Sequence, residues 1–221
     1  MLHSLRKIIQ AVSSAEDLQS ALKLVVNQVR RAMRTDVCSI YLHFPQTDNY
    51  VLMATEGLNQ GSIGKACLPS GKGLVGLVGL KAETINITRA ADHPSFHYVQ
   101  ETGEEAFSSF LGVPIVHHRK VLGILVVQQS IERQFSTEEE AMLITLSAQL
   151  AGFIAHAEAT GGGLRQDALA DEASSDVAYE GVSGSGGVAI GHVAVIVPPA
   201  DLNKVPDRRC RNPELEVEAF Q

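Results

Sequence analysis

Two apolar runs separated by a short basic turn constrain the fold of this chain more than any other feature. Residues 110–116 lead into the basic turn at 117–120, and residues 121–128 follow as a nearly continuous apolar segment. This pattern predicts a β-hairpin. Pro114 has no amide hydrogen to donate, so we expect it at a sheet edge or beside a bulge.

Helical periodicity lies on either side of this hairpin in the sequence. Apolar spacing predicts a short helix at 2–12 and a second helix that ends near Arg34. Residues 13–16 (Ser-Ser-Ala-Glu) fit a capping box, which we expect to begin the second helix. Residues 136–139 (Ser-Thr-Glu-Glu) fit another capping box, before a long final helix. The apolar stripe of that final helix consists of Leu143, Leu146, Leu150 and Ile154.

The segments between these landmarks complete an α+β pattern. A short apolar helix is predicted at 74–81, although Gly76 and Gly79 weaken that prediction. The order of elements predicts an α/β sandwich, with a central antiparallel sheet of about six strands and helices on both sides. Besides the hairpin, strands are predicted at 37–44, 50–55, 63–68 and 84–87.

A change of composition after residue 160 divides the chain. We expect one domain at 1–160. Residues 161–178 are rich in Gly, Ala, Ser and acidic residues, which is typical of a flexible linker. Residues 179–221 combine small apolar residues with Gly and Ser and end in the pattern of a helix that has just begun. We therefore expect this last part to be the truncated start of a second, β-containing domain.

Composition argues against nucleic-acid and membrane partners. The chain has 18 Lys and Arg against 25 Asp and Glu, a formal net charge of −7, and no long basic run. Either partner would favour clustered basic residues. No signal peptide is evident, no run approaches the roughly 18 apolar residues that span a bilayer, and the three cysteines form no CxxC pair. The sequence therefore predicts a cytoplasmic protein.

Particular residues carry a resemblance to a known family. Residues 1–157 resemble the GAF domains, which sense ligands and are related in shape to PAS domains. Segments 93–98 (His-Pro-Ser-Phe-His-Tyr), 110–115 (Phe-Leu-Gly-Val-Pro-Ile) and 122–129 (Leu-Gly-Ile-Leu-Val-Val-Gln-Gln) resemble one branch of it, the N-terminal domain of the nitrogen-branch enzyme I of the bacterial phosphotransferase system. Residues 179–191 look like the opening of the phosphotransfer domain of that enzyme.

The resemblance implies a parent enzyme that uses phosphoenolpyruvate and magnesium to phosphorylate its own histidine. The phosphoryl group then passes to a small phosphocarrier protein. The acceptor histidine of the family lies in a Gly-rich Ser-His motif, which the Gly191-His192 pair does not match. We therefore assign no catalytic residue and no cofactor to this segment, and expect it to be inactive by itself.

The long irregular segment at 84–110 is the candidate ligand site. Loops of this length in compact domains are often functional, and the resemblance places the GAF pocket between the sheet and this crossover. Aromatic side chains can form a wall, while Arg, His and Ser bind carboxylate or amide groups. Alternatively, the aromatic residues belong to the core and the polar groups cap loops. The candidate ligand-binding residues are Asn86, Arg89, His93, Phe96, Tyr98, Ser108, Ser109 and Phe110.

Two other patterns support a site less well. Residues 71–76 fit the phosphate-binding pattern GxGxxG, but no acidic residue stands at the distance that a ribose contact needs. His93 and His97 are four residues apart and the turn at 117–118 is a His pair, yet a metal site needs three or four converging ligands. We predict neither a dinucleotide site nor a metal site.

Three functions stay open at this point. The first, which we favour, is a regulatory sensor that binds a nitrogen-status metabolite of the glutamine or 2-oxoglutarate class and controls phosphotransfer. The second is a ligand-free interaction module that forms a homodimer through its terminal helices, as the resemblance implies. The third is an independent enzyme, since some GAF relatives reduce methionine sulfoxide with cysteines. Cys38 and Cys67 lie in predicted strands and do not reproduce such a set.

Overall fold

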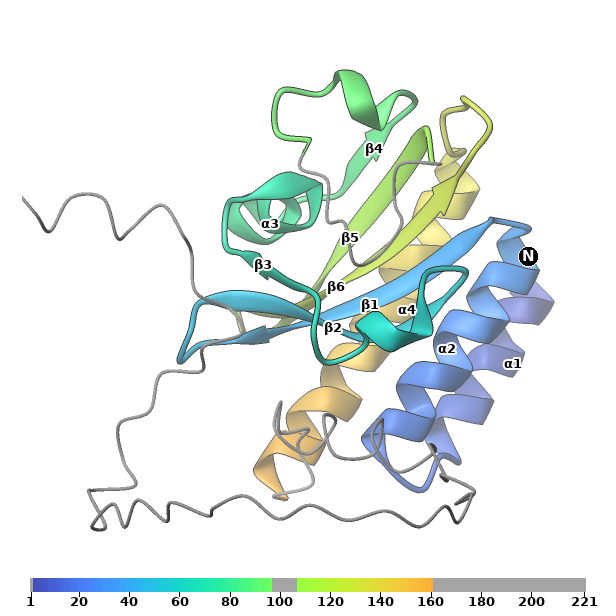
Figure 1. Cartoon of the computed structure of the whole chain (residues 1–221). Coiled ribbons are helices and arrows are strands. Elements are labelled where there is room, and N and C mark those ends of the chain that lie inside the picture. Colours follow the sequence, from blue (N-terminus) through green and yellow to red (C-terminus); the bar gives the residue numbers. More distant parts are fainter. Residues whose placement is uncertain (1, 97–106, 161–221) are drawn as a thin grey trace, which may run out of the picture.

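A six-stranded antiparallel sheet forms the centre of the computed structural model, which describes residues 2–96 and 107–160 (Figure 1). The strand order is β3-β2-β1-β6-β5-β4. The predicted α+β fold is confirmed, with helices on both faces of the sheet. The strands are β1 (Val37–Phe44), β2 (Asn49–Glu56), β3 (Cys67–Pro69), β4 (Ile85–Ile87), β5 (Ser109–His117) and β6 (Lys120–Gln129). The helices are α1 (Leu2–Ser13), α2 (Leu18–Met33), α3 (Gly73–Lys81) and α4 (Thr137–Ala159), with single turns η1 (Gln60–Ser62) and η2 (Ala90–Asp92).

Side chains on successive strand residues alternate between two cores. Cys38, Ile40 and Leu42 of β1 belong to the larger core, which α1, α2 and α4 cover on one face of the sheet (Figure 1). Tyr41 of the same strand belongs to the smaller core, under α3 on the other face. This alternation is what the period of two residues in a strand requires. The predicted stripe of α4 is buried in the larger core at Leu143, Leu146, Leu150 and Ile154.

The β5–β6 hairpin forms as predicted, with a turn of only two residues. His118 and Arg119 have φ angles of 45° and 67°. Positive φ at both central residues is typical of the type I′ turns that connect twisted strands. Pro114 lies beyond Gly112, the last β5 residue that pairs with β4, and just before a register shift. The expectation that Pro114 lies at an edge or bulge is therefore confirmed.

The start of α2 corrects the sequence prediction. The N-cap is Asp17, whose carboxylate accepts a hydrogen bond of 2.7 Å from the backbone N–H of Ser20. The hydroxyl groups of Ser13 and Ser14 instead donate to carbonyl groups at the end of α1. The capping-box assignment at 13–16 was therefore wrong. A serine hydroxyl can accept a hydrogen bond from an N–H group at the start of a helix or donate one to a carbonyl group at its end, and the sequence pattern does not distinguish the two.

Helix α3 forms despite its glycines because these residues let it pack closely. A Cβ at Gly79 would lie 2.1 Å from the hydroxyl oxygen of Tyr50 on β2, and one at Gly76 would lie 2.6 Å from the carbonyl oxygen of Pro69. Gly71 has a φ of 80°, which glycine adopts at little cost. Turn geometry and close packing thus account for the glycines in the GxGxxG pattern.

Two predicted elements differ in extent, and others lie outside the described residues. Strand β3 is shorter than the predicted 63–68, because residues 60–62 form a 3₁₀ turn and Gly64 has a φ of 73°. A helical turn occurs at 90–92, whereas most of its predicted range, 95–100, is not described. The predicted linker at 161–178 and second domain at 179–221 also lie outside the described residues.

In the described part of the chain, α4 is the one helix long and apolar enough to cross a membrane by length and composition. Core helices of soluble proteins pass the same test. Here one side of α4 packs against the sheet, as the burial of Leu143 and Leu150 shows.

Candidate functional site

A small cavity lies between α3 and the sheet. Its volume is about 20 Å³, which gives room for roughly one water-sized group. Strand β5 contributes Phe110, β6 contributes Gln128, and the first turn of α3 closes one side. The full lining is Leu68, Gly73, Leu74, Val75, Phe96, Phe110 and Gln128.

Gln128 gives this mainly apolar lining an amide group. Its side chain lies on the α3 face of β6, because Ile124 and Val126 at alternate positions of the strand pack under α3. The residue is only 6% exposed, and its oxygen Oε1 has no hydrogen-bond partner among the described residues. A buried acceptor without a donor costs about 1–3 kcal/mol. A ligand that brings a donor to this oxygen would remove that cost.

The first turn of α3 borders the same cavity. The N–H groups of Gly73, Leu74 and Val75 have no acceptor inside the helix, since the first turn of any helix lacks one. The N-cap residue Lys72 makes no side-chain capping bond to them. These groups also form the positive end of the helix dipole. The cavity therefore combines backbone donors on one side with an amide acceptor on another.

Two of the predicted site residues, Phe96 and Phe110, are brought together in this lining. Phe110 is buried in the smaller core, and Phe96 is half-buried against it. Phe96 and Phe110 are thus core residues that also form a cavity wall. The two interpretations of these aromatic residues, core packing and a pocket wall, are therefore compatible. Tyr98, the third predicted aromatic residue, lies outside the described residues.

The polar residues of the predicted loop make local contacts. Arg89 is exposed, and its Nε lies 3.1 Å from Oδ2 of Asp92. His93 accepts a hydrogen bond of 3.1 Å at Nδ1 from the backbone N–H of Ser95. Ser108 joins the loop to β6, because its N–H donates to the carbonyl of residue 129 at 2.9 Å. None of Arg89, His93 and Ser108 is among the cavity-lining residues.

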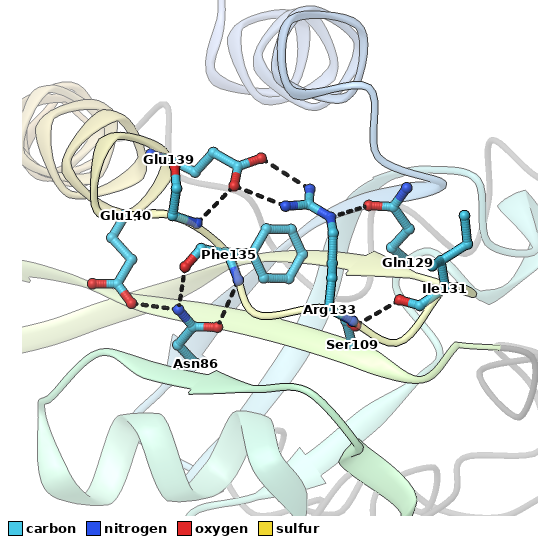
Figure 2. Close-up of polar contacts among 9 residues, drawn as sticks. Asn86, Ser109, Gln129, Ile131, Arg133, Phe135, Glu139 and Glu140 are labelled. Atoms are coloured by element: carbon cyan, nitrogen blue, oxygen red, sulfur yellow. Dashed lines mark hydrogen bonds and ion pairs between the residues drawn. The ribbon is translucent and has the colours of Figure 1, made fainter.

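Asn86 and Ser109 hold the loop that leads into α4 (Figure 2). The amide nitrogen of Asn86 donates to the carbonyl of Phe135 at 2.9 Å, and its oxygen accepts from the N–H of Phe135 at 3.2 Å. The hydroxyl of Ser109 donates to the carbonyl of Ile131 at 2.7 Å and accepts from the N–H of Arg133 at 2.8 Å. Both predicted site residues thus fix the 130–136 loop.

Arg133 connects this loop to α4 (Figure 2). Its guanidinium group donates to both carboxylate oxygens of Glu139 at 2.8 and 2.9 Å and to Oε1 of Gln129 at 2.7 Å, and it lies 4.2 Å from the ring centroid of Phe135. Glu139 also completes the predicted capping box with Ser136. Burial raises the pKa of Glu139, but hydrogen bonds from Arg133 and Ser136 and the charge of Arg133 outweigh it and lower that pKa overall.

Sequence reasoning missed both Gln128 and Arg133. The signal for Gln128 was available, since it is a polar residue that extends an alternating set of apolar positions on β6. Arg133 had no comparable signal, because its partners come from β6 and α4 and the loop between them has no periodicity.

The histidines that the structure describes do not gather with other metal-ligating side chains. In residues 2–96 and 107–160, no group of three or more His, Cys, Asp and Glu side chains could hold a metal ion. The rings of His117 and His118 contact each other, with centroids 4.1 Å apart, at the end of the β5–β6 hairpin. His97 lies outside the described residues.

Comparison with known proteins agrees with this architecture. The GAF domain family model matches residues 17–154, which is more than half of the chain. A Salmonella typhimurium protein named for the phosphoenolpyruvate-dependent phosphotransferase system is 44% identical over 160 residues, which cover 72% of this chain and 21% of that protein. The chain therefore spans about a fifth of the length of this curated relative.

Two solved domains match over nearly their whole length. The GAF domain of a phosphoenolpyruvate-protein phosphotransferase (ptsP) from Coxiella burnetii is 46% identical with a TM-score of 0.70, covering 72% of this chain and 95% of that one. The corresponding Acinetobacter domain is also 46% identical, with a TM-score of 0.67 and coverage of 72% and 96%. The chain thus belongs to the GAF domain family, and the part of it that the structure describes is similar to the GAF domains of PtsP-type phosphoenolpyruvate-protein phosphotransferases.

Proposed function

We propose that this GAF domain is a regulatory sensor that binds a small nitrogen-status metabolite in the cavity under α3. The metabolite is of the glutamine or 2-oxoglutarate class, and its binding controls phosphotransfer in the parent enzyme. The observation that carries the proposal is the buried oxygen of Gln128, which has no hydrogen-bond partner among the residues that the structure describes and lies in a cavity that the first turn of α3 also borders. Aromatic walls with a few converging polar groups are the usual composition of small-molecule sites.

The link to phosphotransfer rests on the relatives. Their names support a parent enzyme that transfers a phosphoryl group from phosphoenolpyruvate to a protein. We propose that this enzyme is cytoplasmic, uses magnesium and passes the phosphoryl group to a phosphocarrier protein. We assign that chemistry, its cofactor and its carrier to the remainder of the enzyme. In this proposal the GAF domain contributes regulation.

Ligand entry requires a local opening. A site for a whole metabolite occupies several hundred Å³, whereas the present cavity holds about 20 Å³. Phe96 is the half-buried wall residue, and it follows the single turn η2 rather than a long helix or strand. Displacement of this ring would enlarge the cavity without disturbing the sheet. The ligand would then select the open conformation by binding to it alone.

A thermal-shift screen tests the sensor proposal. The 221-residue chain is heated with amino acids, 2-oxo acids, cyclic nucleotides and phosphoenolpyruvate. We expect a saturable rise in the midpoint temperature with a member of the proposed class, since a ligand at 100 times its Kd adds about 2.7 kcal/mol of stability. Arg89→Ala and His93→Ala test whether the loop residues predicted from the sequence contribute. The absence of a shift with every compound would overturn the proposal.

We also propose a homodimer through the terminal helices. Ile144 on the outer side of α4 is 47% exposed, although the other large apolar residues of α4 pack into or against the larger core. Helix α1 packs beside both α2 and α4, so the two terminal helices share one face of the domain (Figure 1). Such a dimer is compatible with ligand binding, because the cavity lies on the opposite face of the sheet.

A further inference from the structure

The turn between β5 and β6 forms a basic surface at one end of the sheet. Residues 116–120, which we call the hairpin tip, read Val-His-His-Arg-Lys in a chain with a net charge of −7. Val116 is 39% exposed, and both Arg119 and Lys120 are exposed. Neither of these two basic side chains forms an ion pair with another residue that the structure describes. We propose that the hairpin tip binds an acidic segment of the same chain, residues 167–172.

The backbone of the hairpin tip presents basic side chains at a cost in stability. The register of β5 shifts between Ile115 and Val116, and a bulge can redirect a side chain. His118 and Arg119 have φ angles of 45° and 67°, a region that Asn and Gly occupy more easily than other residues. An Asn-Gly turn would therefore be more stable here. Backbone held in such a region is more frequent at functional positions than elsewhere.

The hairpin tip lies at the end of the sheet toward which α4 runs (Figure 1). Helix α4 begins beside the start of β5, since Asn86 bonds to Phe135 before the helix and pairs with Leu111 of β5. The helix then packs along β5. Its 23 residues span about 34 Å, and the nine residues of β5 span about 30 Å. Residue 160 therefore comes at the same end of the domain as the hairpin tip.

Residues 167–172 (Asp-Ala-Leu-Ala-Asp-Glu) have the complementary composition. They carry three carboxylates, and the chain has no Lys or Arg between residues 166 and 203. Leu169 stands between the acidic residues, as Val116 stands beside the basic residues of the hairpin tip. Opposite charges attract the two segments, and contact between Leu169 and Val116 would remove apolar surface from water.

The short tether between the two segments favours binding within one chain. Residue 167 follows residue 160 by seven positions, and seven extended residues reach about 25 Å at most. A short flexible tether gives an effective concentration in the millimolar range. Exposed ion pairs are individually weak, so the contact is reversible. It would hold the start of the linker on the GAF domain and restrict the positions of the residues that follow. This inference is independent of the sensor proposal, because it needs no ligand.

NMR spectroscopy of the isotope-labelled 221-residue chain tests the contact. The heteronuclear NOE of residues 167–172 reports their mobility, and the amide shifts of residues 116–120 report whether the hairpin tip is occupied. Raising the salt concentration from about 0.1 M to about 1 M shortens the Debye length from about 10 Å to about 3 Å. We expect this change to lower the NOE values of residues 167–172 and to move the resonances of the hairpin tip.

Charge changes on the two segments test whether they bind each other. Lys120→Glu should weaken docking about three- to tenfold, which is the effect of one or two exposed ion pairs. Combining it with Asp171→Lys and Glu172→Lys should restore the wild-type NOE values, because the charges are exchanged between the segments. Lys81→Glu is the matched control. Lys81 is exposed at the end of α3, just before β4, which pairs with the start of β5 at the far end of the sheet.

The outcomes decide between the acidic segment and other occupants. Loss of the NOE in Lys120→Glu, its recovery on charge exchange and no effect of Lys81→Glu would support the contact. NOE values that respond neither to salt nor to Lys120→Glu would overturn it. Resonances of the hairpin tip that move with protein concentration would assign this surface to a second copy and also overturn it. If Lys120→Glu does not fold, Arg119→Asn replaces it, since Asn removes the charge and tolerates the positive φ.

Discussion

Two amide side chains in this domain have opposite surroundings. Both the donor and the acceptor of the Asn86 amide are bonded to the backbone of Phe135, which fixes the loop before α4. The oxygen of Gln128 has no hydrogen-bond partner within the described part of the chain, and the residue lines a cavity. A paired buried amide stabilises the fold, whereas an unpaired one costs free energy. Asn86 therefore stabilises the fold, whereas Gln128 belongs to the proposed ligand site, although the sequence pattern had pointed only to Asn86.

At the same scale, the carboxylate of Glu139 makes stability depend on pH. Its pKa in the folded protein lies below the ordinary value of 4.5. The stabilisation is therefore complete above the unfolded-state pKa and is lost as the pH falls through the lower, folded-state pKa. We expect Glu139→Gln to lower the free energy of unfolding by about 1–3 kcal/mol at pH 7, because it removes charge-assisted bonds to Arg133.

Urea denaturation of both proteins between pH 7 and pH 3 checks this prediction. The difference in unfolding free energy between wild type and Glu139→Gln should shrink towards the acid end. Glu138→Gln is the control, since Glu138 is exposed in the same helical turn and should have a smaller effect. A difference that stays constant with pH would show that the carboxylate of Glu139 is not the titrating group.

Among the elements, α3 shows where local propensity and tertiary packing disagree. Gly76 and Gly79 weaken a helix prediction because glycine has low helix propensity. In the structure these glycines allow contact with Pro69 and Tyr50 that a larger residue would prevent. Strand β6 and helix α4 showed no such conflict, and their periodicity predicted them closely. Elements were therefore predictable where local pattern and packing favoured the same structure.

A pair of glycine substitutions tests this account of α3. Gly79→Ala places a Cβ 2.1 Å from the hydroxyl oxygen of Tyr50, and we expect overpacking to destabilise the domain by about 1–3 kcal/mol. Gly152→Ala is the matched change in α4, where a Cβ would meet no atom within 4 Å. It should stabilise the domain by about 0.5–1 kcal/mol through helix propensity alone. Thermal denaturation should show midpoint shifts of opposite sign, and two stabilising changes would contradict the close packing of α3.

For the whole molecule, the sequence predicted the architecture better than the site. Periods of two and 3.6 residues identified the strands and helices, and the capping box at Ser136 located the start of α4. The cavity is made by residues from β3, α3, β5, β6 and the segment before residue 97, and its polar group comes from a strand rather than the predicted loop. Such a site depends on which elements become neighbours, and no periodicity within one segment carries that information.

Association of two copies is also a property of the whole molecule. The proposed dimer uses α1 and α4, so it should be sensitive to Ile144, which is 47% exposed on α4. We expect sedimentation equilibrium of the wild-type chain to give a dimer, and Ile144→Lys to weaken association at least tenfold, because a charge would have to be buried without a partner.

Ile131→Lys is the matched control. Ile131 is more exposed, at 65%, but lies in the loop before α4. Both variants should keep the wild-type thermal midpoint within a few degrees, since surface substitutions change stability by only about 0.5 kcal/mol. A wild-type chain that stays monomeric at the highest concentration reached would exclude this dimer, and equal weakening by both variants would place the interface elsewhere.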